Sequence, residues 1–149
     1  MGGPPPRVRG PAEVKDILAD THAAIWALFE PDRLSAAAVE AIEDAQAAGG
    51  RVLVSAVTPI EATYLTERGR LAAPVLQGLW AAASDPSVPF DVLPVTANVA
   101  LVLDQVLRGR VPAMPCRIVA ATALAHGLRL VSADRGIRSL DLPGLAVVW

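Results

Sequence analysis

Short apolar runs alternate along this chain with longer Ala-rich stretches in which apolar residues recur at helical spacing. We expect strands at residues 16–19, 51–55, 90–94, 129–132 and 145–149, because each run is short and apolar. Strands that alternate with helices form βαβ units, whose parallel sheet is covered by helices on both faces. The pattern therefore predicts an α/β fold with a parallel sheet.

The stretches between these runs predict helices at 35–48, 59–68, 73–83, 97–107 and 117–126. Ser35 is a typical N-cap, and the Gly49-Gly50 pair ends the same helix. Pro59 suits a first helical turn, where its missing N–H has no partner to lose. Glu61 is accordingly expected in the first turn of that helix.

The length of 149 residues fits one domain with a sizeable core. Residues 1–13 are rich in proline and glycine and offer little to bury, so we expect a flexible leader there and a folded domain over residues 14–149. Hydrophobic residues make up 53% of the chain but aromatic residues only 4%. The core must therefore be built from Ala, Val and Leu rather than from large rings.

The formal net charge of -2 argues against a protein that binds nucleic acid through a broad basic surface, although a local arginine cluster remains compatible with it. The single cysteine, Cys116, excludes an intramolecular disulfide. No apolar stretch approaches the roughly 18 residues of a membrane span. We therefore expect a cytoplasmic protein without a membrane partner.

Three acids stand where an apolar segment meets a polar one, namely Asp20, Glu61 and Asp134. The carboxyl ends of parallel strands form one edge of a sheet, so Asp20 and Asp134 share a pocket if their strands are neighbours. Clustered carboxylates repel one another unless a cation is present. Oxygen ligands favour Mg²⁺ or Mn²⁺, and such ions serve phosphodiester hydrolysis. Each acid taken singly also suits a helix cap.

Four segments of the chain resemble motifs of the PIN-domain ribonuclease toxins of the VapC type. The first is Leu18-Ala19-Asp20-Thr21-His22 with Trp26, and the second runs from Ser55 through Glu61 to Leu71. The third and fourth are 117–123 and 130–135, and the resemblance covers essentially all of residues 17–149. It implies a three-layer α/β/α sandwich with a short, mainly parallel five-stranded sheet.

The resemblance also implies a function. It makes the chain the toxin of a type II toxin–antitoxin system, a Mg²⁺- or Mn²⁺-dependent endoribonuclease that hydrolyses RNA. Its partners would be a VapB-like antitoxin and a second copy of the chain in a homodimer. Asp20, Glu61 and Asp134 match the acidic positions that bind metal and carry catalysis. The family's fourth acid, an aspartate before the arginine of the third motif, is replaced by Cys116.

A neutral thiol at position 116 should weaken Mg²⁺ binding and impair activity. The change could be an inactivating one that makes a toxic nuclease tolerable, or the chain could be a nuclease-inactive module that only binds antitoxin and dimerises. Cys116 could also be a small buried apolar residue in either case. A phosphotransfer domain with Asp20 as acceptor is disfavoured, because no second acid follows closely and no lysine is well placed.

Other residues have both a functional and a structural interpretation. Arg117, beside the acidic site, could contact RNA or antitoxin, whereas the remaining arginines are more typical of solvated helix ends. His22 is expected to support the site or the structure, and His126 to end a helix. Large apolar groups on the early helices are expected mainly in the core. Those that are exposed together would form a groove for an antitoxin helix or a dimer seam.

Overall fold

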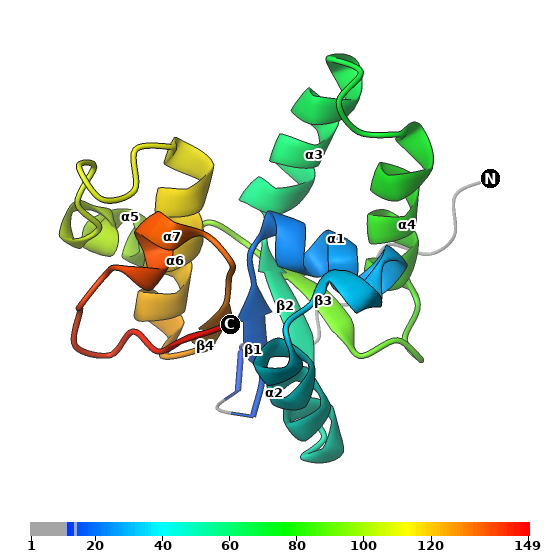
Figure 1. Cartoon of the computed structure of the whole chain (residues 1–149), viewed down its shortest axis with the longest axis horizontal. Coiled ribbons are helices and arrows are strands. Elements are labelled where there is room, and N and C mark those ends of the chain that lie inside the picture. Colours follow the sequence, from blue (N-terminus) through cyan, green and yellow to red (C-terminus); the bar gives the residue numbers. More distant parts are fainter. Residues whose placement is uncertain (1–11, 14) are drawn as a thin grey trace.

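The computed structural model describes residues 12–13 and 15–149, and its centre is a five-stranded sheet in the order β3-β2-β1-β4-β5 (Figure 1). The strands are β1 (Ile17–Ala19), β2 (Val52–Ser55), β3 (Phe90–Leu93), β4 (Arg129–Val131) and β5 (Val147–Val148). Every pairing is parallel. All five predicted strands are therefore confirmed, each somewhat shorter than its apolar run. The predicted leader and the predicted domain start at residue 14 fall largely outside the described residues, and the single domain over 14–149 stays a prediction.

Seven α-helices surround the sheet in the described part of the chain. They are α1 (Thr21–Phe29), α2 (Ala36–Ala47), α3 (Val57–Glu67), α4 (Ala73–Ser84), α5 (Ala97–Val102), α6 (Met114–His126) and α7 (Arg135–Arg138), with 3-10 turns η1 (Pro31–Arg33) and η2 (Leu103–Gln105). Within the described residues, no helix is long and apolar enough to cross a membrane.

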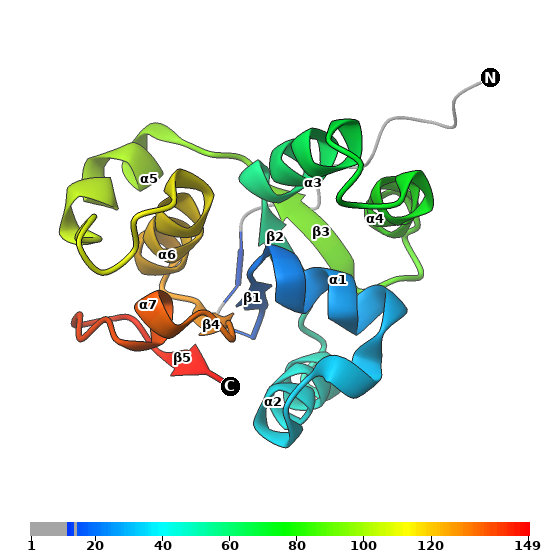
Figure 2. The same cartoon turned by 45° about the horizontal axis from the view of Figure 1, so that its top comes forward.

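Two separate cores lie on the two faces of the sheet, because successive strand side chains point to opposite faces. Ile17 and Ala19 of β1 pack into a core with α1, α2 and α4, whereas Leu18 packs into a second core with α6. Figure 2 shows α1 and α2 on one side of the sheet and α5 and α6 on the other. The three-layer α/β/α sandwich is confirmed.

The helix predicted to end at residue 107 stops earlier, since α5 ends at Val102 and the chain continues as η2. Thr96 caps its start, accepting a hydrogen bond from the backbone N–H of Val99 at 3.4 Å. The guanidinium of Arg117 donates to the carbonyl oxygens of Leu103 and Val106 at 3.3 and 3.0 Å, and the Leu103 carbonyl also accepts the backbone N–H of Val106 at 3.1 Å. A tertiary contact from α6 therefore holds the segment that follows α5.

Helix α3 begins earlier than predicted, at Val57 rather than at Pro59. The hydroxyl of Ser55 accepts a hydrogen bond from the backbone of Val57 at 3.1 Å and satisfies the first free N–H of the helix. Glu61 therefore lies one turn inside α3 instead of in its first turn. The helix after Ser35 is confirmed, because the Ser35 hydroxyl accepts from the backbone of Ala38 at 3.1 Å.

Strand β1 lies in the middle of the sheet, with Leu18 paired to Leu53 of β2 on one side and to Leu130 of β4 on the other. The chain builds outward from β1 through β2 to β3, then crosses back over the sheet through α5 and α6 to enter β4. Strand order thus reverses at β1. In open α/β sheets, the crevice at the carboxyl ends of the strands at such a point is the usual ligand site.

Candidate active site

Asp20 lies directly after β1, at the reversal of strand order, and only 8% of it is exposed. One carboxylate oxygen caps α1 by accepting the backbone N–H of Ala23 at 2.8 Å. The other accepts a hydrogen bond from the hydroxyl of Ser132. Burial raises the pKa of Asp20, and these two hydrogen bonds only partly offset the effect. The carboxylate is therefore fixed in place but poorly solvated.

Asp134 lies after the neighbouring strand β4 and caps the short helix α7, accepting from the backbone of Ile137 at 2.9 Å. Its own backbone N–H donates to the hydroxyl of Ser132 at 3.1 Å. The Ser132 hydroxyl therefore donates to the Asp20 carboxylate and accepts from the backbone N–H of Asp134, so one side chain connects the two acids. Strands β1 and β4 are paired. This pairing is what the sequence required for Asp20 and Asp134 to share a pocket.

Glu61 and Cys116 approach the same place from α3 and α6. A pocket of about 340 Å³ joins the four predicted positions, and it is lined by Asp20, Thr21, His22, Trp26, Glu61, Pro115, Cys116, Val119, Ala133 and Asp134. Burial and then the charges of Asp134, Glu61 and Asp20 raise the pKa of the Cys116 thiol to about 11. All three acids thus act electrostatically on one sulfur atom, and the thiol is neutral at physiological pH.

Comparison with known proteins places this pocket in a family, because the family model described as "PIN domain" matches residues 17–142. A sequence relative, Ribonuclease VapC22 of Mycobacterium tuberculosis (strain ATCC 25618 / H37Rv), is 38% identical over 135 residues. That alignment covers 89% of this chain and 98% of the relative. The chain is a PIN-domain protein of the VapC type.

Two solved structures share the PIN fold at low sequence identity. One is VapBC2 from Rickettsia felis bound to a DNA fragment from their promoter, with a TM-score of 0.62, 14% identity and coverage of 88% of this chain and 96% of that one. The other is a toxin–antitoxin complex from Klebsiella pneumoniae, with a TM-score of 0.57, 20% identity and the same coverage of 88% and 96%. At these identities the likeness concerns the fold alone.

PIN-domain ribonucleases generally use divalent metal ions, and the pocket offers the donors that such ions prefer. Its three carboxylates are hard oxygen ligands, whereas the neutral Cys116 thiol is a soft one. Within residues 12–13 and 15–149, however, no three Asp, Glu, His or Cys side chains stand close enough together to hold an ion. The donor chemistry fits a hard divalent ion, while the ligand set is not assembled in advance.

Arg117 is half-buried, and its guanidinium donates to the two carbonyl oxygens near η2 described above. These bonds tie the start of α6 to the segment after α5, so they also position Cys116, the preceding residue. A structural role accounts for Arg117 without a ligand. A contact of Arg117 with RNA or antitoxin stays a prediction, because the two hydrogen bonds described here lie within the chain.

Two hydroxyl residues of this PIN site were not predicted as site residues. Ser132 connects Asp20 with Asp134, and Thr21 shares a buried hydrogen bond of 3.0 Å with Thr58, which ties α1 to α3 beside the pocket. Ser132 stands two residues before Asp134 inside a recognised motif, so its position was visible in the sequence. Its role was not, because the bond to Asp20 spans 112 residues.

Proposed function

We propose that this chain is the toxin of a type II toxin–antitoxin system and an endoribonuclease that hydrolyses RNA with Mg²⁺ or Mn²⁺. The observation that carries the proposal is that Asp20, Glu61 and Asp134 line one pocket at the ends of β1 and β4, in a chain related to a ribonuclease. RNA as substrate makes the cytoplasm the expected place of action.

The acids have distinct parts in this proposal. Asp20, fixed by Ala23 and Ser132, is the rigid ligand, while Asp134 and Glu61 complete the site from α7 and α3. A bound divalent ion would supply polarisation of the phosphate and activation of water. Three carboxylates around one pocket also repel RNA phosphates in the absence of the ion, so activity should depend strictly on metal.

Cys116 makes this site weaker than a four-acid site. Its thiol carries no charge near neutral pH, so the pocket has one fewer anionic ligand than the family pattern implies. The same observation favours a second candidate function, a nuclease-inactive PIN module that retains antitoxin binding and dimerisation.

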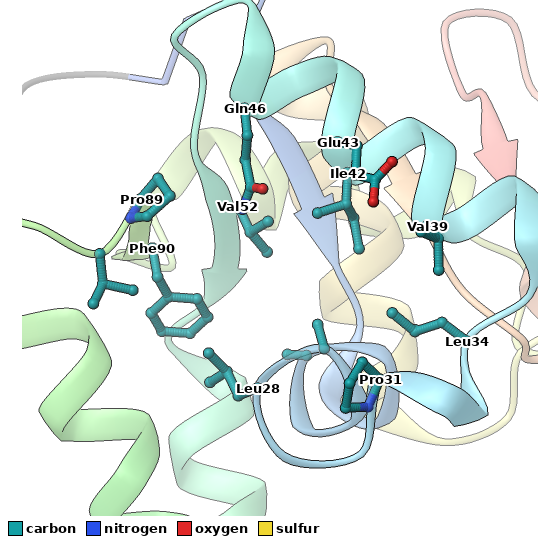
Figure 3. A pocket seen from close by; sticks show the side chains of 13 residues that line it. Leu28, Pro31, Leu34, Val39, Ile42, Glu43, Gln46, Val52, Pro89 and Phe90 are labelled. Carbon is teal, nitrogen blue, oxygen red and sulfur yellow. The ribbon is translucent and has the colours of Figure 1, made fainter.

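The proposed partners are a VapB-like antitoxin and a second copy of the chain, and the surface supports an apolar partner. Phe29, Tyr64 and Trp80 are 41%, 50% and 47% exposed on α1, α3 and α4. A separate, mainly apolar hollow of about 230 Å³ opens between α1, α2 and the starts of β2 and β3. Figure 3 shows Leu28 and Phe90 pointing into it. Such a surface suits the apolar face of a helix.

The decisive experiment compares RNA cleavage by the unmodified chain, Cys116→Asp and Cys116→Ser, with Mg²⁺, with Mn²⁺ and after chelation. We expect Cys116→Asp to cleave RNA on the order of 10- to 100-fold faster than the unmodified chain, because changes in the groups that support a metal site commonly alter activity by this factor. Cys116→Ser, which is small and neutral, should behave like the unmodified chain. Asp20→Asn in the Cys116→Asp background should abolish cleavage.

Each result separates the two candidates. Equal, metal-dependent cleavage by all three chains would show that Cys116 does not impair the site. Absence of cleavage by folded Cys116→Asp on several RNAs would refute the nuclease proposal. Antitoxin binding by the unmodified chain, measured in the same preparation, would then leave the interaction module as its function.

A further inference from the structure

An aromatic cluster stands beside the acids, and the proposed metal site does not use it. The His22 and Trp26 rings are 5.9 Å apart between centroids and tilted by 48°. Trp26 in turn contacts Trp149, with centroids 5.7 Å apart, and the guanidinium of Arg33 lies 4.7 Å from the Trp26 ring centroid. Trp26 is therefore held by Trp149 and Arg33 while His22 packs on it from the pocket side.

The cluster opens into the same pocket as the acids. His22 and Trp26 both line it, and they are four residues apart on α1, so they lie on one face of the helix. His22 is exposed, whereas Trp26 is half-buried. Asp20 lines this pocket together with both rings.

Core packing explains only the inner part of this cluster. Trp149 packs against the core that includes α1 and α2, but His22 belongs to neither core. Among the described residues, Trp26 is the ring that contacts His22, and the rest of the His22 ring is exposed at a pocket of about 340 Å³. The volume is at the lower end of the range of about 300–1,000 Å³ that small-ligand sites span.

We infer that His22, backed by Trp26, is the stacking surface for an unpaired nucleobase of single-stranded RNA whose phosphate lies at the acids. This inference rests on the proposed function. The chain has a formal net charge of -2 and three acids in the pocket, so charge alone gives the nucleotide beside the metal little affinity. Stacking on an aromatic ring supplies affinity that does not depend on charge, and single-stranded RNA is commonly held in this way.

Binding is tested without cleavage by fluorescence anisotropy of a labelled single-stranded RNA, with Ca²⁺ as the divalent ion and the RNA checked for integrity. His22→Ala should raise Kd by at least about 5-fold, the lower end of the effect of base stacking measured by alanine substitution. His22→Phe keeps a flat ring without nitrogens and should bind like the unmodified chain. Leu101→Ala is the matched control, because Leu101 is an exposed apolar side chain on α5 outside the pocket.

A set of RNAs with one abasic position each locates the stacked base. One of them should bind the unmodified chain as weakly as the complete RNA binds His22→Ala. Unchanged Kd for His22→Ala overturns the inference. Weakened binding in both His22→Ala and His22→Phe, with no abasic RNA affected, also overturns it, because the ring nitrogens rather than the ring face would then hold RNA.

A cleavage measurement in the Cys116→Asp background separates stacking from proton transfer. His22→Ala should raise KM and leave kcat nearly unchanged, since the ring is proposed to hold substrate. A fall in kcat at constant KM contradicts the inference and gives His22 a role in chemistry. If Cys116→Asp cleaves RNA but adding His22→Ala does not change KM, the stacking inference is wrong and the proposed function stands. If Cys116→Asp neither binds nor cleaves RNA, the proposed function fails and the inference with it.

Discussion

A buried ion-pair network at the end of the sheet opposite the pocket gives a prediction that can be worked out in magnitude. Asp16 precedes β1, Arg51 precedes β2, and Asp91 lies in β3. Arg51 is 2.9 Å from the Asp16 carboxylate and 3.1 Å from that of Asp91, and the side-chain exposures of Asp16, Arg51 and Asp91 are 1%, 14% and 17%. The network therefore joins the three strands at their amino-terminal ends.

Arg51→Met keeps much of the apolar stem but removes the charge, and it leaves the Asp16 carboxylate buried. Two backbone N–H groups still donate to Asp16, from Glu13 at 2.8 Å and from residue 51 at 2.7 Å. We therefore expect a loss near the lower end of the range for a broken buried pair, about 3 kcal/mol. At about 2–4 °C per kcal/mol for a domain of this size, Tm should fall by about 6–12 °C.

The pH dependence of this loss follows from the pKa of Asp16. Burial raises that pKa, but hydrogen bonds from the Arg51 side chain and from the backbone N–H groups of Glu13 and Arg51 outweigh it and leave the pKa below its ordinary value. Asp16 thus contributes stability above its unfolded pKa of about 3.9, and this contribution is lost as pH falls through the folded pKa. Without the guanidinium, burial is less opposed and the pKa rises. The difference between the two proteins should therefore shrink as pH falls below about 4.

Urea unfolding of the unmodified chain and Arg51→Met between pH 3.5 and 7 tests both statements. Arg108→Met is the matched control, because Arg108 is exposed and its replacement should change stability by less than about 0.5 kcal/mol. A loss at pH 7 of only about 0–1 kcal/mol, as for an exposed pair, would refute the reasoning. So would a loss that is the same at both ends of the pH range.

Two further predictions concern the surroundings of the site. Gly136→Ala should lower the free energy of unfolding by about 1–3 kcal/mol, measured by thermal or urea unfolding, because the new Cβ would lie 2.2 Å from the carbonyl oxygen of Arg110. Gly109→Ala is the control, because its Cβ meets open space and should not destabilise the protein. Alkylation of Cys116 by iodoacetamide should be slow at pH 8, because the thiol pKa is about 11, and Glu61→Gln should speed it by removing one of the charges that raise this pKa. Equal labelling rates for the two chains would contradict the proposed closeness of Glu61 to the sulfur.

The strands were predictable because a parallel sheet covered on both faces turns each strand into an apolar run. The ends of the helices were less so. At the start of α3 the Ser55 hydroxyl accepts the N–H of Val57, and after α5 the Arg117 guanidinium donates to the carbonyl oxygens of Leu103 and Val106. Both contacts come from side chains that bind backbone groups, and the one at α5 acts between elements distant in sequence. Helical periodicity does not report such bonds.

The sequence predicted that the three acids would line one pocket, but not which residues hold them there. Apolar runs place Asp20 and Asp134 at strand ends, yet nothing local shows that β1 pairs with β4, because the pairing depends on the crossover through α5 and α6. Motif order supplied that step through the family resemblance. The hydrogen bond from Ser132 to Asp20 and the tilted contact between the His22 and Trp26 rings are seen only in the structure.

Position 116 shows why fold and chemistry can change independently in this protein. Cys116 is the third residue of α6, and it packs against the second core, so a small apolar side chain is well accommodated. An aspartate would also suit a first helical turn, where a negative charge is favoured. A helix N-terminus usually lowers a thiol pKa, but burial and three neighbouring carboxylates raise this one to about 11. The cysteine therefore removes a charge from the pocket without removing support from the fold. Nuclease activity could decline in this way while the proposed partner-binding surface on α1, α3 and α4 persists.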